Sequence, residues 1–170
     1  MPEDLDSVIR SALVGPVDPT DPDDAAAMAG LRRAWMEEWS GGPLGDPHFE
    51  ERMRVWLVDE SPRRTVWRAD LVRGDADAVG PVGMISLVHV ARMPAPGRGS
   101  EGWGYVGGVF VRAEHRNRGV GRELLDAVVA EARTRRYDRV VLHPSARSIP
   151  LYRRAGFRGA DELLVHPLDG

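Results

Sequence analysis

The sequence of 170 residues contains no cysteine. This absence excludes a disulfide framework, a cysteine-ligated zinc or iron–sulfur site and a thiol nucleophile, and it fits a reducing compartment. A chain of this length buries most of its surface on folding, so its core needs neither a disulfide nor a metal. We therefore expect a single globular domain over residues 1–170.

Lysine is also absent, because all 23 basic residues are arginine. The chain therefore lacks the lysine of a Schiff base and the lysine of a Walker-type phosphate loop. Histidines are few and show no helical pair spacing, so we expect no metal site. No apolar run reaches the length of a membrane span, and the acidic residues 1–6 lack the basic region of a secretory signal. These features predict a cytoplasmic protein without membrane contact.

Charge is distributed unevenly along the chain. Residues 1–60 carry 14 acidic residues and 5 arginines, whereas residues 61–170 carry 12 acidic residues and 18 arginines. The two parts thus have net charges of −9 and +6, although the whole chain carries only −3. We expect the two parts to attract different partners. Nucleic acid is not among them, because no basic stripe is interleaved with aromatic residues.

Residue spacing predicts the elements of the N-terminal part. Residues 1–22 are expected to be a loosely held segment with a short first strand at 8–12. Apolar residues at three- and four-residue spacing then predict a helix over 25–39, capped by Asp23 or Asp24 and ended by Gly41 and Gly42. The further expected elements are a helix over 49–58, strands over 65–72 and 82–90, and a hairpin loop over 74–81.

The C-terminal part reads as alternating strands and helices. Its expected elements are strands over 105–111, 139–142 and 163–166 and helices over 120–136 and 149–155. Gly107 and Gly108 interrupt the first of these strands, which suggests a bulge or a place where another group approaches the backbone closely. A strand, helix and strand in succession imply one parallel pair in an otherwise antiparallel, mixed α/β sheet.

A glycine-containing loop joins the strand over 105–111 to the helix over 120–136. Its residues are Arg116, Asn117, Arg118, Gly119, Val120 and Gly121, and Arg122 follows in the helix. The glycines leave main-chain N–H groups accessible at a helix start, where the helix dipole and the arginines favour an anion such as a pyrophosphate. The alternative is a glycine turn with solvated arginines. A dinucleotide fingerprint is excluded, because Leu124 stands where its third glycine would be.

A second motif follows the strand over 139–142: Leu151-Tyr152 before Gly156-Phe157. Together with the glycine loop, and in this order and spacing, it resembles the GNAT superfamily of acyl-CoA-dependent N-acetyltransferases over about a third of the chain. The resemblance implies a GNAT-like fold. In that fold a mostly antiparallel sheet is flanked by about four helices, and one parallel pair of strands splays around the cofactor, acetyl-CoA.

The resemblance also assigns roles to residues. The pantetheine arm would bond to main-chain groups of Val109, Phe110 and Val111, and the pyrophosphate would bind the loop of residues 116–122. Tyr152 would protonate the leaving thiolate, although an aromatic residue packed on the sheet is the alternative. Ser145 stands where the family often has a cofactor-binding asparagine, and it can still form a hydrogen bond.

The general base is left open by the sequence. Many members of the family carry a carboxylate early in the strand before the loop, where this chain has Gly107 and Gly108. Glu101 is our choice on proximity in the sequence. The alternatives are His89, Glu37 and Glu38.

The implied activity is transfer of an acetyl group to a primary amine of a small molecule or peptide by direct attack. The alternative is a non-catalytic acyl-CoA sensor or interaction module. Because residues 1–60, with a net charge of −9, would face the acceptor, a cationic amine is expected. Dimers are common in the family, so a homodimer is among the expected assemblies. The aromatic residues that could wall the acceptor side, or equally belong to ordinary core stripes, are Trp35, Trp39, Phe49 and Trp56.

Overall fold

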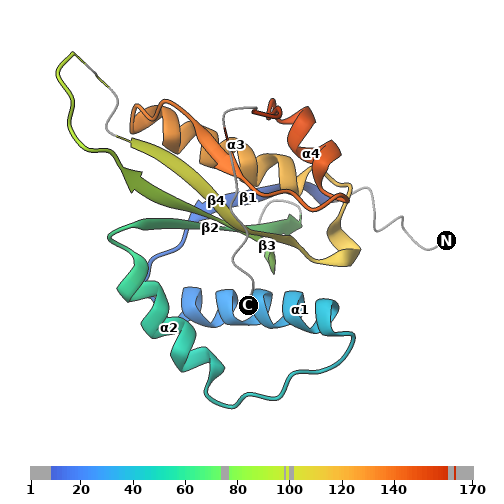
Figure 1. Cartoon of the computed structure of the whole chain (residues 1–170). Coiled ribbons are helices and arrows are strands. Elements are labelled where there is room, and N and C mark those ends of the chain that lie inside the picture. The colour runs from blue at the N-terminus through green and yellow to red at the C-terminus, as the bar shows by residue number, and fades with distance from the viewer. Residues whose placement is uncertain (1–8, 74–76, 98, 100–101, 161–162, 164–170) are drawn as a thin grey trace.

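A computed structural model describes residues 9–73, 77–97, 99, 102–160 and 163. Its centre is one five-stranded sheet in the order β1-β2-β3-β4-β5 (Figure 1). The first four strands are antiparallel to their neighbours, and β5 runs parallel to β4. The mixed sheet predicted from the sequence is therefore confirmed. The strands are β1 (Ile9–Pro16), β2 (Arg64–Arg73), β3 (Asp77–Ala91), β4 (Gly102–Val111) and β5 (Val140–Leu142).

Helices cover both faces of the sheet (Figure 1). One face carries α1 (Pro22–Ser40) and α2 (Phe49–Glu60), and the other carries α3 (Val120–Thr134) and α4 (Ile149–Arg154). A short 3₁₀ helix, η2 (Ala113–His115), lies between β4 and α3. These are the four helices expected from the spacing of apolar residues. None of the helices that the structure describes is long and apolar enough to cross a bilayer.

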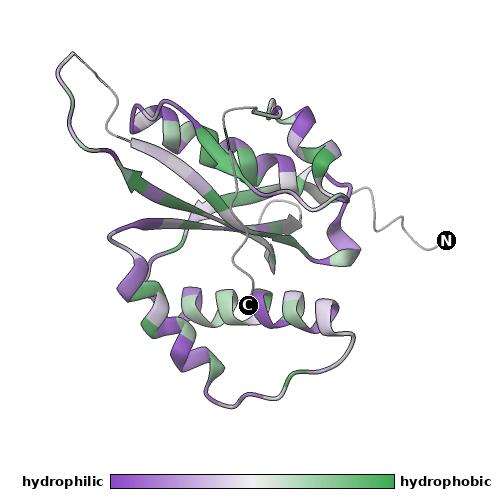
Figure 2. Ribbon diagram, viewed as in Figure 1, coloured by the Kyte–Doolittle hydropathy of each residue, from purple (hydrophilic) through white to green (hydrophobic). Residues whose placement is uncertain are grey.

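Each helical layer packs its own apolar core against the sheet. On the α3 side, Leu124, Leu125 and Val128 are fully buried together with Ile85 and Leu87 of β3. On the α1 side the core is formed by a second set: Met28, Leu31, Leu57, Met84 and Phe110. Figure 2 shows the resulting green apolar strands and helix faces between the two layers. The sheet is therefore buried on both faces, as expected for a sheet with helices on each side.

Two features of β4 interrupt its regular pairing with β3. Met84 pairs with Phe110 but Ser86 pairs with Gly107, so β4 contains one extra residue at this point. Gly108 has φ +67°, a left-handed conformation that glycine adopts at no steric cost. The bulge expected from the paired glycines is thus confirmed.

The parallel ladder between β4 and β5 is short. It comprises only the pairs Gly104–Val140, Tyr105–Val141 and Val106–Leu142. Beyond Val106, β4 continues to Val111 while β5 ends at Leu142. The two strands therefore part where the bulge begins, and no strand of the described residues pairs with this edge of β4 beyond Val106.

Some predicted boundaries were wrong. The first strand runs to Pro16 instead of ending near residue 12, because it pairs with β2 along its length. The strand expected over 82–90 begins earlier, at Asp77. Pro81 and Gly80 pair with Asp70 and Leu71 of β2, and a register shift on each side of these two pairs keeps them within the ladder. Asp21, rather than Asp23 or Asp24, caps α1 by accepting the Asp23 N–H. Most of the strand expected over 163–166 lies outside the described residues.

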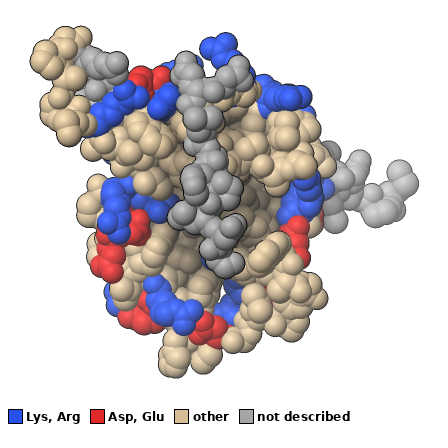
Figure 3. All heavy atoms as spheres, viewed as in Figure 1, with Lys and Arg blue, Asp and Glu red and all other residues tan. Residues whose placement is uncertain are grey.

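The uneven distribution of charge along the sequence does not divide the face of the molecule drawn in Figure 3 into two regions of opposite sign. In Figure 3 arginines lie next to acidic side chains in both helical layers. On α2, Arg54 pairs with Glu51 at 2.7 Å, and Arg63, which follows the helix, pairs with Glu60 at its end. Some of the acidic side chains in residues 1–60 are therefore paired with a nearby arginine.

Candidate active site

The loop before α3 forms an uncapped helix start. Gly119 is the N-cap residue with φ +91°, and no side chain caps the helix. Its carbonyl accepts hydrogen bonds from the N–H groups of Arg122 at 2.8 Å and Glu123 at 3.1 Å. The main-chain N–H groups at the very start of this 15-residue helix are therefore left for another acceptor. Together with the positive end of the helix dipole they form an anion-binding geometry.

Two of the arginines around this loop are engaged with the protein itself. Arg116 pairs with Glu38 of α1 at 2.5 Å and donates through Nε to the Val111 carbonyl at 2.9 Å. Arg122 pairs with Asp126 at 2.9 Å and donates to the Arg154 carbonyl at 2.8 Å. These side chains therefore brace the loop against α1 and α4. Asn117 adopts φ +61°, and both Asn117 and Arg118 are exposed.

Main-chain groups of β4 face the gap between β4 and β5. Arg112 donates its N–H to the Val82 carbonyl of β3. Because main-chain groups alternate along a strand, those of Val109 and Val111 point away from β3 and toward the gap. Phe110 instead pairs with Met84, and its ring is 5% exposed and stacks on Trp35 with centroids 5.9 Å apart. Of the three strand residues named from the sequence, Val109 and Val111 thus face the gap.

Tyr152 of α4 packs into the core on the α3 side. It is 8% exposed, and its ring meets Phe157 edge-on at 5.9 Å. Burial raises the pKa of the Tyr152 hydroxyl above its ordinary value, and a hydrogen bond with Ser148 acts weakly in the opposite direction. The hydroxyl is therefore protonated at neutral pH. Ser145 lies in the same segment, with its Oγ 3.0 Å from Ser148 Oγ.

Close packing holds α4 against the start of α3. A Cβ atom on Gly121 would lie 3.2 Å from a methyl group of Leu151 and 3.9 Å from Val111. Leu151 precedes Tyr152, so the absence of a side chain at Gly121 sets how closely Tyr152 approaches the loop. The structure thus brings together the loop, the β4 edge and Tyr152, all of which were named from the sequence.

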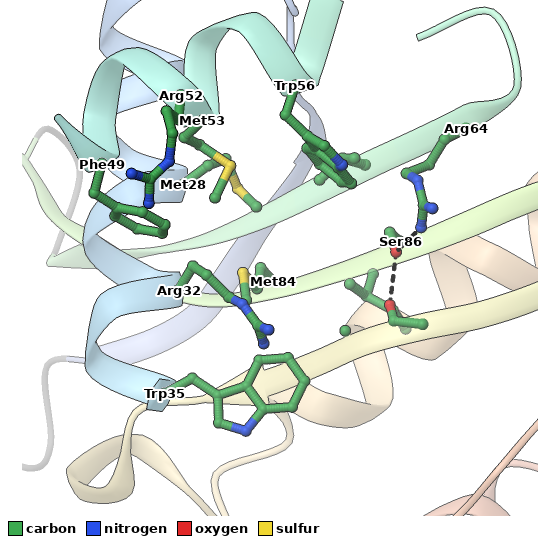
Figure 4. A pocket seen from close by; sticks show the side chains of 14 residues that line it. Met28, Arg32, Trp35, Phe49, Arg52, Met53, Trp56, Arg64, Met84 and Ser86 are labelled. Carbon is green, nitrogen blue, oxygen red and sulfur yellow. Dashed lines mark hydrogen bonds between the residues drawn. The ribbon is translucent and has the colours of Figure 1, made fainter. Parts of the chain in front are cut away.

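A cavity of about 510 Å³ lies on the other face of the sheet, beneath α1 and α2 (Figure 4). Its wall includes the bulge glycines Gly107 and Gly108, so it reaches the point where β4 and β5 part. The other lining residues are Met28, Arg32, Trp35, Phe49, Arg52, Met53, Trp56, Arg64, Val66, Met84, Ile85 and Ser86. Three of the four aromatic residues proposed for an acceptor wall line it; the fourth, Trp39, is 80% exposed.

A hydrogen-bonded chain crosses the inner end of the cavity. Arg64 donates through Nη1 to Ser86 Oγ at 3.2 Å, and Ser86 donates to the Gly107 carbonyl at 2.7 Å, as the dashed lines in Figure 4 show. Arg64 also pairs with Glu60 at 3.3 Å and lies over the Trp56 ring. Sequence reasoning did not single out Arg64 or Ser86, because their partners lie on other strands.

The three candidate bases that the structure describes do not line this cavity. His89 bonds to Thr65 and Tyr137, and burial lowers its pKa. Its position in β3, three residues after Ser86, places it on the α3 face. Glu38 is held by Arg116, which lowers the pKa of its carboxyl, and Glu37 accepts the Leu44 N–H at 3.1 Å. Glu101 lies outside the described residues. Among the described residues that line the cavity there is no carboxylate and no histidine.

Over the described ranges, no group of three or more histidine, aspartate or glutamate side chains is placed to hold a metal ion.

Comparison with protein families identifies the class. The sequence profile of the Acetyltransferase (GNAT) family matches residues 28–157. This match covers most of the chain, from α1 through Phe157 and including the loop, the β4 bulge and Tyr152. The protein belongs to the GNAT acetyltransferase family, and its fold is that of an acyltransferase. A comparison with curated protein sequences finds no significant match.

Solved structures share the fold over nearly the whole chain. A GCN5-related N-acetyltransferase from Ralstonia eutropha is 24% identical, covering 94% of this chain and 100% of that chain with a TM-score of 0.64. A predicted acetyltransferase from Clostridium acetobutylicum, solved with acetyl-CoA, is 16% identical, with coverages of 92% and 96% and a TM-score of 0.66. Glucosamine-6-phosphate N-acetyltransferase from Arabidopsis thaliana is 10% identical, with coverages of 94% and 100% and a TM-score of 0.67.

Proposed function

We propose that the protein transfers the acetyl group of acetyl-CoA to a primary amine of a small molecule or peptide by direct attack. One observation carries this proposal: an anion-binding helix start and an apolar cavity lie on opposite faces of the sheet and both adjoin β4, the helix start beside Val111 and the cavity at Gly107 and Gly108. A donor held on one face and an acceptor on the other would bring thioester and amine together at Gly107 and Gly108. Family membership supports acetyl transfer in general.

The donor side fits an extended, anionic thioester such as acetyl-CoA. The uncapped N–H groups at the start of α3 suit a pyrophosphate. Main-chain groups of Val109, which face the gap beyond the last β4–β5 pair, suit the amides of a pantetheine arm. An N–H group at this edge is also placed to stabilise the oxyanion that forms on the thioester carbonyl.

The acceptor must reach the thioester as a neutral amine. No carboxylate or histidine is found among the described lining residues, and in the proposed mechanism the cavity itself favours loss of the proton. Its apolar walls and arginines do so, because burial and nearby positive charge both lower the pKa of an amine. The amine nitrogen then attacks the carbonyl carbon and the C–S bond breaks. The thiolate takes a proton from Tyr152, and the new amide nitrogen loses its proton to water.

Binding and turnover test this function in succession. Isothermal titration is expected to show saturable binding of both acetyl-CoA and CoA. Assays of thiol release with a panel of amines are then expected to show turnover that requires both substrates. Absence of acetyl-CoA binding would refute the proposal outright.

The pH dependence of the reaction reports whether the chain supplies a base. With no base among the described residues that line the cavity, kcat/KM is expected to rise with pH at a midpoint that follows the pKa of the amine itself. We would compare two amines whose pKa values in water differ by about two units. A midpoint that stays constant between them would show that an enzyme group, with Glu101 as the first candidate, removes the proton.

The absence of a carboxylate or histidine from the described lining residues favours a second function, a non-catalytic acyl-CoA sensor that has kept the fold. This alternative predicts binding of acetyl-CoA without acetylation of any amine. Thiol release above the rate of the uncatalysed reaction, for any amine in the panel, would exclude it.

A further inference from the structure

The cavity carries an unbalanced positive charge. Three arginines line it, and its described lining residues include no acidic side chain. Two of these arginines are neutralised by carboxylates outside the cavity wall: Arg52 pairs with Asp46 at 2.5 Å, and Arg64 pairs with Glu60. Within the described part of the chain, Arg32 forms no ion pair. One guanidinium charge is therefore available to a molecule that enters the cavity.

Arg32 is held in position by an aromatic ring. Its guanidinium carbon lies 4.5 Å from the centroid of the Trp35 ring, one turn further along α1, and its side chain is partly buried. Figure 4 shows it extending from α1 across the cavity toward Trp35. The guanidinium group is planar, and its N–H groups can bind a carboxylate or phosphate through two parallel hydrogen bonds.

Trp35 also connects Arg32 to the reacting position. A Cβ atom on Gly108 would lie 3.8 Å from the edge of the Trp35 ring, and the guanidinium of Arg32 lies over that ring. The anion-binding group and the bulge where the amine must react are thus separated by little more than one aromatic ring. A single small molecule can span them.

The rest of the wall is apolar and adaptable. It is built largely from aromatic rings and thioethers: Phe49, Trp56, Met28, Met53 and Met84. Methionine side chains fill irregular gaps and contact aromatic rings favourably, so this wall suits an apolar or aromatic body. If the acceptor carried an ammonium group in addition to the reacting amine, that group would be buried near the positive charge of Arg32, which would weaken binding.

Building on the proposed function, we infer that the acceptor is a small amine that carries one anionic group, a carboxylate or a phosphate, on an apolar body. Arg32 binds the anionic group, the methionines and aromatic rings enclose the body, and the amine lies at the β4 bulge. Apolar α-amino acids have this combination of groups. The acidic residues of the N-terminal part suggested a cationic acceptor, but the cavity wall favours the opposite charge.

The test compares amines that share one body and differ in charge. Acetylation by the full chain is measured with phenylalanine, its phosphonate analogue, phenylalanine amide and phenethylamine, each corrected for its fraction of neutral amine. We expect kcat/KM to be about tenfold or more higher for the anionic amines than for the amide. The faster of the two anionic amines identifies the preferred group. Equal or higher values for the amide and phenethylamine would overturn the inference.

Variants of two arginines test whether Arg32 causes the preference for anionic amines. Arg32→Met keeps an unbranched side chain over Trp35. It is expected to bring the ratio of kcat/KM for phenylalanine to kcat/KM for its amide close to one, whereas Arg32→Lys retains part of the preference. The matched control is Arg54→Met on α2. Arg54 pairs with Glu51 and does not line the cavity, so the ratio should persist. An unchanged ratio in Arg32→Met would overturn the inference.

Binding separates this inference from the proposed function. With CoA present, 3-phenylpropionate, which has no amine, is expected to alter the tryptophan fluorescence saturably in the wild type and only weakly in Arg32→Met. This result would support the anion site even if no amine were acetylated. Absence of saturable binding to the wild type would overturn the site. Equal acetylation of acid and amide by an active enzyme would leave acetyl transfer standing and refute the anion preference.

Discussion

Replacing Tyr152 with phenylalanine is expected to lower kcat by about 10²-fold and to leave the Kd of acetyl-CoA nearly unchanged. The substitution keeps the ring that packs edge-on against Phe157 and removes only the hydroxyl. Because burial raises the pKa of this hydroxyl, it holds its proton throughout the neutral range. It can then supply that proton to the thiolate as the C–S bond breaks. Thiol-release kinetics and isothermal titration measure the two quantities.

Tyr137→Phe is the matched control for this experiment. It also removes one tyrosine hydroxyl, but that hydroxyl bonds to His89 at 3.0 Å and lies away from the loop and the bulge. We expect kcat to change little in this variant. Loss of turnover to the same extent in both variants would indicate a general effect on folding, and unchanged turnover in Tyr152→Phe would remove the residue from the acid role. Melting temperatures of the two variants show whether the fold is retained.

The pH profile adds a second signature of Tyr152. Since its pKa lies above the ordinary value of about 10, wild-type kcat should show no alkaline decline until above that pH. A decline that begins well below pH 10 and disappears in Tyr152→Phe would contradict the raised pKa.

The elements around the donor site could be predicted from the sequence because their signals are local. Val120, Leu124 and Val128 step by four residues along α3, and the structure buries all three. The bulge in β4 was signalled by paired glycines that need no distant partner. In contrast, the extent of β1 and the start of β3 depend on pairing with β2, which local propensity does not encode.

The cavity beneath α1 and α2 was harder to predict, because it forms only when α1, α2 and the sheet come together. Its aromatic residues were indistinguishable from core stripes in the sequence. One signal was present: Arg32 lies four residues after Met28 and three before Trp35, so a charge interrupts the apolar face of α1. The net charge of the N-terminal part does not report the charge at the cavity, since some of its acidic side chains, such as Asp46, are paired with arginine at the surface. Local charge around a cavity, rather than the sum over a segment, therefore decides which ligand it favours.

In the proposed function, binding of acetyl-CoA depends on the backbone conformation of one glycine, Gly119, and its substitution is the second change with a large expected effect. Gly119→Ala is expected to raise the Kd of acetyl-CoA by about 10- to 100-fold. The φ of +91° at this N-cap position is strained for any residue with a Cβ atom, even though nothing lies within 4 Å of the added methyl group. Relief of that strain would turn the first N–H groups of α3 away from the bound pyrophosphate. Isothermal titration of acetyl-CoA measures the change.

Gly41→Ala provides a control with nearly the same backbone strain at a different place. Gly41 ends α1 with φ +77°, and a Cβ atom there also meets nothing within 4 Å. The two variants should therefore lose comparable stability, while only Gly119→Ala weakens acetyl-CoA binding. If both variants bound acetyl-CoA as the wild type does, the pyrophosphate would not be held by the start of α3. If both lost affinity equally, the loss would follow from reduced stability and not from the geometry of the loop.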